Sequence, residues 1–165
     1  ARGAGLDLAQ VVAICPVLDP AHTLRCLEDG WALYRWYFVR KWKRSLVRKQ
    51  VAWPSAYDLD DVLALSTLTD MTRLLATRYG GYPTLEDYLR GYAIVGDALA
   101  GIECPARIIA ASDDPIIPAA DLARLARPAS LSITLTPHGG HCGYYDAQHV
   151  SSWLERQVLA TLAAR

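Results

Sequence analysis

Three short apolar segments of the chain have the character of β-strands. Two of them are continuous runs rich in valine, isoleucine and alanine, "LAQVVAICP" at residues 8–16 and "CPARIIAAS" at 104–112. Such runs predict strands buried on both faces, as in a parallel sheet. The third segment, "LSITLT" at 131–136, alternates apolar and polar positions. This alternation predicts a strand near the edge of the sheet.

The segment from about residue 19 to 100 shows helical spacing instead. Its apolar side chains recur every three or four residues along one long helix, in a stripe formed by Leu27, Trp31, Tyr34, Phe38, Trp42 and Leu46. Residues 57–78 also have a helical pattern. Thr84, with Asp87 three residues later, is close to the capping box that begins a helix. We therefore expect an irregular, all-helical insertion between the first two strands.

The order of the expected elements defines the fold class. A short helix at 119–126 lies between the second and third strands, and a last helix is expected at roughly 147–163. Strand, helical insertion, strand, helix, strand, loop and helix is the order of an α/β fold. Right-handed crossovers would place the helices against both faces of a parallel sheet. Ligands of such sheets bind at the carboxyl ends of the strands.

Two polar loops lie directly after predicted strands, "SDDPIIP" at 112–118 and "HGGHCG" at 138–143. The glycines before His141 allow turns that other residues avoid, and such loops carry function more often than packing. Asp113 and Asp114 could each accept the Nδ1 proton of a histidine on the neighbouring loop. The same residues would also fit a solvated Asp-Asp-Pro turn, and on this motif alone the two interpretations are equally favoured.

Composition narrows the classes of partner. The chain has 165 residues, enough for about one domain, with 17 basic and 17 acidic residues. This balance predicts no general attraction to nucleic acid, and we expect no nucleic-acid partner. No apolar run reaches the roughly 18 residues of a transmembrane helix, and the N-terminus lacks a signal-peptide layout. We expect a cytoplasmic protein, with a peripheral position at the membrane as an alternative.

The four cysteines, Cys15, Cys26, Cys104 and Cys142, predict neither a disulfide framework nor a metal site. They form no CxxC pair and have no zinc-site spacing to nearby histidines. Free thiols in a reducing compartment are the favoured interpretation. Cys142 could be reactive because it follows His141, but a small packed side chain is favoured.

Residues 35–49 combine aromatic side chains with seven cations, Arg35, Arg40, Lys41, Lys43, Arg44, Arg48 and Lys49. The favoured interpretation is that the aromatic stripe packs onto the sheet while the cations face water. The alternative is a peripheral contact with an anionic membrane, for which basic amphipathic helices are suited.

The two polar loops, taken with the helical insertion between the strands, resemble the C-terminal end of an α/β-hydrolase. Three further stretches, "VVAICPVLDP", "LEDYLRGYAIVGDALAGIECP" and "YRWYFVRKWKR", are similar to the YheT-like branch, which includes ABHD-type esterases and lipases. The resemblance covers essentially all of residues 1–165. It implies a partial α/β-hydrolase fold: C-terminal parallel-sheet strands with flanking helices and a helical cap at about 19–100.

The resemblance also implies catalytic roles. Members of the family use a serine nucleophile, then an acid, then a histidine, in that chain order. By motif position Asp114 corresponds to the acid and His141 to the base. Asp113 is disfavoured because the residue directly before proline usually holds the acid's place in this turn. His138 is expected to shape the loop.

One part of the family pattern is missing from this sequence. None of the serines lies in a Gly-x-Ser-x-Gly elbow; they are Ser45, Ser55, Ser66, Ser112, Ser130, Ser132, Ser151 and Ser152. The chain also begins with Ala1 and enters a predicted strand within a few residues. We therefore expect a piece of a longer protein, in which the missing N-terminal half of the fold supplies the nucleophile.

The sequence thus predicts an acyl-ester hydrolase whose Asp114 and His141 lie in this chain. The substrate would be a small-molecule or lipid acyl ester, and no metal or organic cofactor is needed. Acyl transfer to an alcohol would use the same residues. The alternative function is not enzymatic. It is a non-catalytic, hydrolase-like protein that acts as a binding or scaffold protein and contacts membranes or a partner through its basic aromatic helix.

Overall fold

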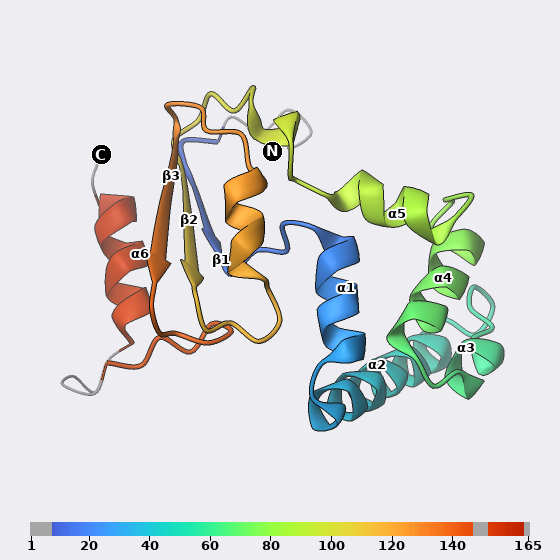
Figure 1. The fold of residues 1–165 in the computed structure, drawn as a ribbon. Helices are drawn as coiled ribbons and strands as arrows, with labels where there is room; N and C mark the ends of the chain where they lie inside the picture. Colours follow the sequence, from blue (N-terminus) through green and yellow to red (C-terminus); the bar gives the residue numbers. More distant parts are fainter. Residues whose placement is uncertain (1–7, 147–151, 164–165) are drawn as a thin grey trace. The chain divides into compact units, whose positions relative to one another are not determined.

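The computed structural model describes residues 8–146 and 152–163 and has a mixed α/β architecture. A parallel sheet contains β1 (Val11–Ile14), β2 (Ala106–Ala111) and β3 (Leu131–Thr136), in that spatial order (Figure 1). In its register, Val11 lies opposite Ala106, which lies opposite Leu131. The three predicted strands, their parallel pairing and the edge position of the third are therefore confirmed. The predicted burial is confirmed only for β2, because β1 forms the other edge and its residues are only half-buried.

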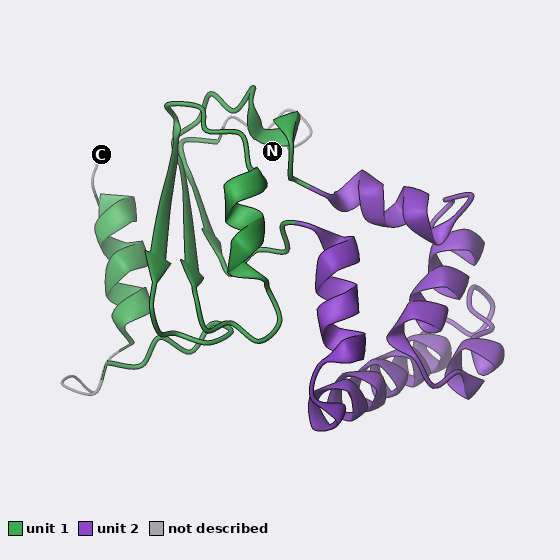
Figure 2. Cartoon of the chain, in the orientation of Figure 1, with its two compact units in different colours: residues 1–18, 94–165 green, residues 19–93 purple. Residues whose placement is uncertain are grey.

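The chain forms two compact units (Figure 2). Unit 1 comprises residues 1–18 and 94–165 and contains the sheet, whereas unit 2 comprises residues 19–93 and is helical. The helical insertion thus ends at residue 93 and not near residue 100. Residues after 93 belong to unit 1 because the Ile94 amide donates to the Leu18 carbonyl at 2.9 Å, and Gly96 forms a parallel bridge with Leu125.

Within unit 1, helices lie on both faces of the sheet, as expected. The helix α6 (Trp153–Ala163) covers one side, and the helical turn η2 (Ala119–Arg124), orange in Figure 1, lies on the other. The Arg107 guanidinium of β2 donates to the side chains of Thr161 and Gln157 on α6, at 2.8 and 3.0 Å. The element predicted at 119–126 is a 3₁₀-helix, and residues 147–151 of the last predicted helix lie outside the described residues.

Unit 2 contains five α-helices: α1 (Pro20–Asp29), α2 (Ala32–Ala52), α3 (Asp60–Ala64), α4 (Leu68–Arg78) and α5 (Leu85–Tyr92). Side-chain caps set three of the starts. Asp19 accepts hydrogen bonds from the first amides of α1, and Thr84 accepts from the Asp87 amide, which confirms the predicted cap. Thr67 caps α4 in the same way, so the helical pattern at 57–78 is divided between two helices.

The core of unit 2 is built around three fully buried side chains, Leu59, Val62 and Met71. Partly buried residues from α2, α3 and α4 surround them, among them Val39, Leu46 and Leu75. Gln50 of α2 ties this core together at the start of α3, because its side-chain oxygen accepts a hydrogen bond from the Leu59 amide at 2.8 Å. Burial of these side chains is the main stabilising contribution in unit 2.

The expected burial of the aromatic stripe on the long helix is wrong. Of the stripe, Trp31, Tyr34 and Trp42 are exposed and Phe38 is half-buried, and no side chain of α2 is buried. The stripe also predicted one continuous helix, whereas the structure ends α1 at Asp29 and begins α2 at Ala32. Periodicity did not reveal that α2 packs against α1, α3 and α4 through only part of its surface. In the described part of the chain, no helix combines the length and apolar character needed to cross a membrane.

Candidate active site

The parallel register brings the ends of all three strands to one edge of the sheet. Cys15 follows β1, Asp113 and Asp114 follow β2, and the histidine loop follows β3. The two polar loops that the sequence singled out are therefore neighbours. This is the edge at which open α/β sheets bind ligands.

Asp114 and His141 are in contact, as the sequence predicted. The Oδ2 atom of Asp114 lies 3.0 Å from Nδ1 of His141, and the aspartate side chain is only 2% exposed. Its other oxygen, Oδ1, accepts hydrogen bonds from the backbone amides of Ile116 and Ile117 at 2.8 and 3.0 Å. Asp114 is thus held by the turn that follows β2 and has one oxygen left for the imidazole. The His141 side chain is 38% exposed, so the ring is accessible from outside the site.

The loop that carries His141 depends on its two glycines. A Cβ atom at Gly139 would lie 2.6 Å from the Tyr144 ring and 3.0 Å from the Ala111 side chain. Gly140 has φ of +53°, in the left-handed region that favours glycine. The Gly139 carbonyl then accepts from the amides of Gly143 and Tyr144, which closes the loop around His141. Gly139 is therefore required because a side chain there would clash with its neighbours, and Gly140 because of its backbone conformation.

Asp113 contacts both the backbone of this loop and the side chain of His138. The Gly140 amide donates to Oδ1 of Asp113 at 2.8 Å, and this hydrogen bond is the main cause of the lowered pKa of Asp113. Oδ2 of Asp113 lies 3.6 Å from Nδ1 of the exposed His138. The two adjacent aspartates thus have different partners, and only Asp114 contacts His141.

The structure also brings Cys15, which the sequence did not connect with this site, next to His141 and Cys142. Ligand atoms of Cys15, His141 and Cys142 all lie within 4.8 Å of one another. The buried Cys15 sulfur is 3.2 Å from the Tyr144 hydroxyl and contacts the Gly140 carbonyl at 3.9 Å. Spacing rules could not have found this group, because Cys15 lies near one end of the chain and the other two near its opposite end. Only the strand order makes them neighbours.

Cys142 does not have the properties of a catalytic nucleophile. Burial of the thiol, followed by the neighbouring Cys15, raises the pKa of Cys142 to about 11. An activated cysteine shows the opposite shift, because the thiolate is the nucleophile. The Cys142 side chain is nonetheless exposed, so the favoured sequence interpretation of a small packed side chain is wrong.

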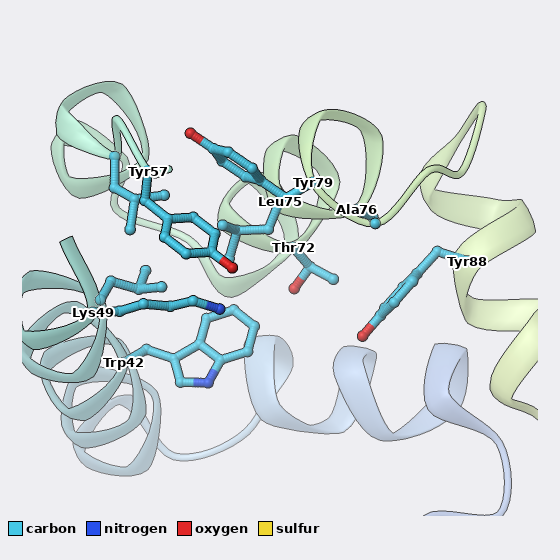
Figure 3. A pocket seen from close by; sticks show the side chains of 11 residues that line it. Trp42, Lys49, Tyr57, Thr72, Leu75, Ala76, Tyr79 and Tyr88 are labelled. Atoms are coloured by element: carbon cyan, nitrogen blue, oxygen red, sulfur yellow. The ribbon is translucent and has the colours of Figure 1, made fainter. Parts of the chain in front are cut away.

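A separate pocket of about 270 Å³ lies within unit 2 (Figure 3). Its walls combine aliphatic side chains with four aromatic ones, Trp42, Tyr57, Tyr79 and Tyr88. Lys49 extends between Trp42 and Tyr57, and its Nζ atom lies 4.3 Å from the centre of the Tyr57 ring. Such a cavity suits a small apolar group with an anionic end, although its volume is slightly below the usual range for ligand pockets of about 300–1,000 Å³.

Comparison with known proteins does not assign this chain to a family. No protein-family model matches the chain, and no curated protein matches it at a significant level. The fold and the site therefore define a mixed α/β protein with a parallel sheet and an Asp–His pair at the carboxyl ends of its strands.

Proposed function

We propose that this chain carries the acid–base part of an acyl-ester hydrolase with an α/β-hydrolase fold. The observation that supports the proposal is the 3.0 Å contact between Oδ2 of Asp114 and Nδ1 of His141 at the carboxyl edge of the sheet. The burial of Asp114 and its two backbone hydrogen bonds add to this support. The substrates would be small-molecule or lipid acyl esters.

In the proposed reaction each residue of the pair has one task. Asp114 holds the proton of His141 on Nδ1, which leaves Nε2 free to accept a proton. Nε2 would take the proton of a serine hydroxyl as that oxygen attacks the ester carbonyl, and would then return it to the leaving alcohol. Asp114 would stabilise the imidazolium that exists between these steps. Neither task requires a metal or an organic cofactor.

The serine belongs to a segment outside these 165 residues in this proposal. The support is the absence of a Gly-x-Ser-x-Gly elbow, the strained turn on which this family exposes its nucleophile. Part of the oxyanion hole would come from the same segment, because one of its amides follows the nucleophile. In this proposal Asp114 and His141 are necessary for forming the acyl-enzyme intermediate, but they cannot form it without the serine.

A comparison of two chains tests this proposal. We expect no ester hydrolysis above background by residues 1–165, and robust hydrolysis of short-chain nitrophenyl esters by a chain extended upstream in its own gene. Release of nitrophenolate measures both. Turnover by residues 1–165 that is lost in His141→Ala would contradict the missing serine, and an inactive, folded extended chain would contradict the proposed hydrolase.

A second candidate function, membrane attachment by a binding or scaffold protein, is favoured by the surface of α2. The helix carries seven arginine and lysine residues and no aspartate or glutamate. The exposed Trp36 ring lies beside Arg40, and Tyr37 lies beside Lys41, with cation-to-ring distances of 5.4 Å. A hollow of about 520 Å³ next to Trp36 is lined by Arg35, Arg40 and Lys43. We propose that this cationic, aromatic surface binds the headgroups of an anionic membrane.

Flotation with vesicles tests the membrane contact. The chain is expected to float with vesicles that contain phosphatidylserine and to remain unbound with pure phosphatidylcholine. Charge reversal at Arg40, Lys41, Lys43 and Arg44 should weaken the partition by on the order of 10³-fold or more, since each cation near an anionic surface contributes about 1 kcal/mol.

The control variant for flotation is Arg73→Glu with Arg90→Glu, because these two cations of unit 2 already pair with Asp70 and Asp87. This control should float like the original chain. Equal flotation of the four-site variant, or equal binding to phosphatidylcholine, would contradict the lipid contact. Flotation combined with an inactive extended chain would favour the scaffold over the hydrolase.

The proposed location is the cytoplasm, at the surface of a membrane. None of the four cysteines forms a disulfide, a state that a reducing compartment maintains. The sulfurs of Cys15 and Cys142 lie close together, so an oxidising compartment would favour a bond between them.

A further inference from the structure

We propose that Cys15, His141 and Cys142 form a binding site for a single zinc ion. This site differs from the proposed hydrolase site in its chemistry and shares with it the His141 ring and the Asp114 carboxylate that orients this ring. Two thiols and one imidazole are the ligand types that zinc prefers, and two cysteines with one histidine leave a fourth position for water. The elements that supply them are the end of β1 and the loop after β3.

The spacing of the three ligands fits a tetrahedral ion. Zinc–sulfur bonds of about 2.3 Å place two sulfurs about 3.8 Å apart, and zinc–nitrogen bonds of about 2.0 Å make the sulfur–nitrogen edges slightly shorter. In the structure the two sulfurs and one ring nitrogen of His141 lie within 4.8 Å of one another. A contraction of roughly 1 Å per edge therefore closes the site, and rotation of the exposed Cys142 side chain would contribute to it.

Asp114 prepares the histidine for a metal. Because its carboxylate occupies Nδ1 of His141, the nitrogen left for coordination is Nε2. A carboxylate that holds the second ring nitrogen is the usual partner of a metal-binding histidine, and it orients the ring and increases its basicity. The burial of Asp114 and its bonds from Ile116 and Ile117 provide this arrangement without any movement.

The backbone and the charges support the same interpretation. Cys15 and Cys142 have φ of +42° and +66°, in the left-handed region that residues other than glycine seldom adopt. Such strain is concentrated at functional positions. Two neighbouring thiolates beside the Asp114 carboxylate would repel one another, and a divalent cation between them removes that penalty by replacing their protons.

Cobalt binding tests the site directly. The reduced chain should bind one equivalent of Co²⁺ with a thiolate-to-cobalt charge-transfer band and the intense visible bands of a tetrahedral ion, and Zn²⁺ should displace it. Cys15→Ser and Cys142→Ser should each reduce the charge-transfer band and weaken binding by more than 100-fold. Asp114→Asn keeps an oxygen for the Ile116 amide, and it should weaken binding by about 10–100-fold.

The matched controls are Cys26→Ser and Cys104→Ser, which remove thiols outside the cluster and should leave the titration unchanged. If Cys15→Ser fails to fold, the result for Cys142→Ser, at an exposed position, tests the proposal. A thermal melt then verifies that Cys142→Ser is folded. The proposal is overturned by the absence of a thiolate–cobalt band, or by a band that Cys142→Ser leaves intact or that the control variants abolish.

Zinc at this site has one consequence that rests on the proposed function. It would occupy the nitrogen with which His141 takes the serine proton, so micromolar zinc should inhibit ester hydrolysis by the extended chain and a chelator should restore it. The cobalt titration of residues 1–165 does not depend on this reaction. Failure of the hydrolase therefore leaves the metal site standing, and failure of cobalt binding leaves the hydrolase standing.

Discussion

Replacing His141 by alanine in the upstream-extended protein should lower kcat for ester hydrolysis by on the order of 10⁶-fold, because the loss of the base from a serine relay costs this much. Asp114→Asn should lower kcat by about 10⁴-fold, since the amide no longer holds the imidazole in the required tautomer. In both variants kcat and kcat/KM should fall together, because the lost interaction belongs to the transition state. Initial rates with nitrophenyl esters at saturating concentration measure the effect.

The matched controls lie in the same two loops. His138→Ala removes an exposed imidazole that faces Asp113, and Asp113→Asn keeps an oxygen that can accept from the Gly140 amide. Both should reduce kcat by less than about tenfold, an effect on loop position and not on proton transfer. Activity that survives His141→Ala, or an equal loss in His138→Ala, would show that the Asp114–His141 pair is not the acid–base machinery.

Leu59→Ala should produce the largest loss of stability in unit 2, about 2–5 kcal/mol in the free energy of unfolding. Leu59 is fully buried with Val62 and Met71, so its truncation removes apolar burial and leaves a cavity that this helical unit can only partly close. The Leu59 amide keeps its hydrogen bond to Gln50, which limits the change to packing. Urea unfolding followed by circular dichroism of the helices measures the loss.

Val51→Ala is the control for this measurement, because Val51 lies on α2 with 75% of its surface exposed. Its effect should stay within about 0.5 kcal/mol. Met71→Ala at a second fully buried position should repeat the large loss. A Leu59→Ala protein as stable as Val51→Ala would mean that this cluster is not the core of unit 2.

Elements whose causes are local could be predicted from the sequence. The strand at Leu131–Thr136 has the bounds that its alternation predicts, and Thr84 begins a helix because its own hydroxyl accepts from an amide three residues later. A contact between an aspartate after β2 and a histidine after β3 was also predictable, because parallel strands end at one edge and each loop directly follows its strand; the choice of Asp114 over Asp113 came from the family resemblance. These features require only neighbouring residues and the direction of the strands.

The tertiary structure alone decided which surfaces are covered and which distant residues meet. Periodicity located α2 but could not show that its aromatic side chains stay exposed, since exposure depends on the helices packed around it. The meeting of Cys15 with His141 and Cys142 follows from strand order, and no spacing rule records it. A local pattern specifies the conformation of its own segment, whereas burial and side-chain clusters arise from contacts between segments that only folding brings together.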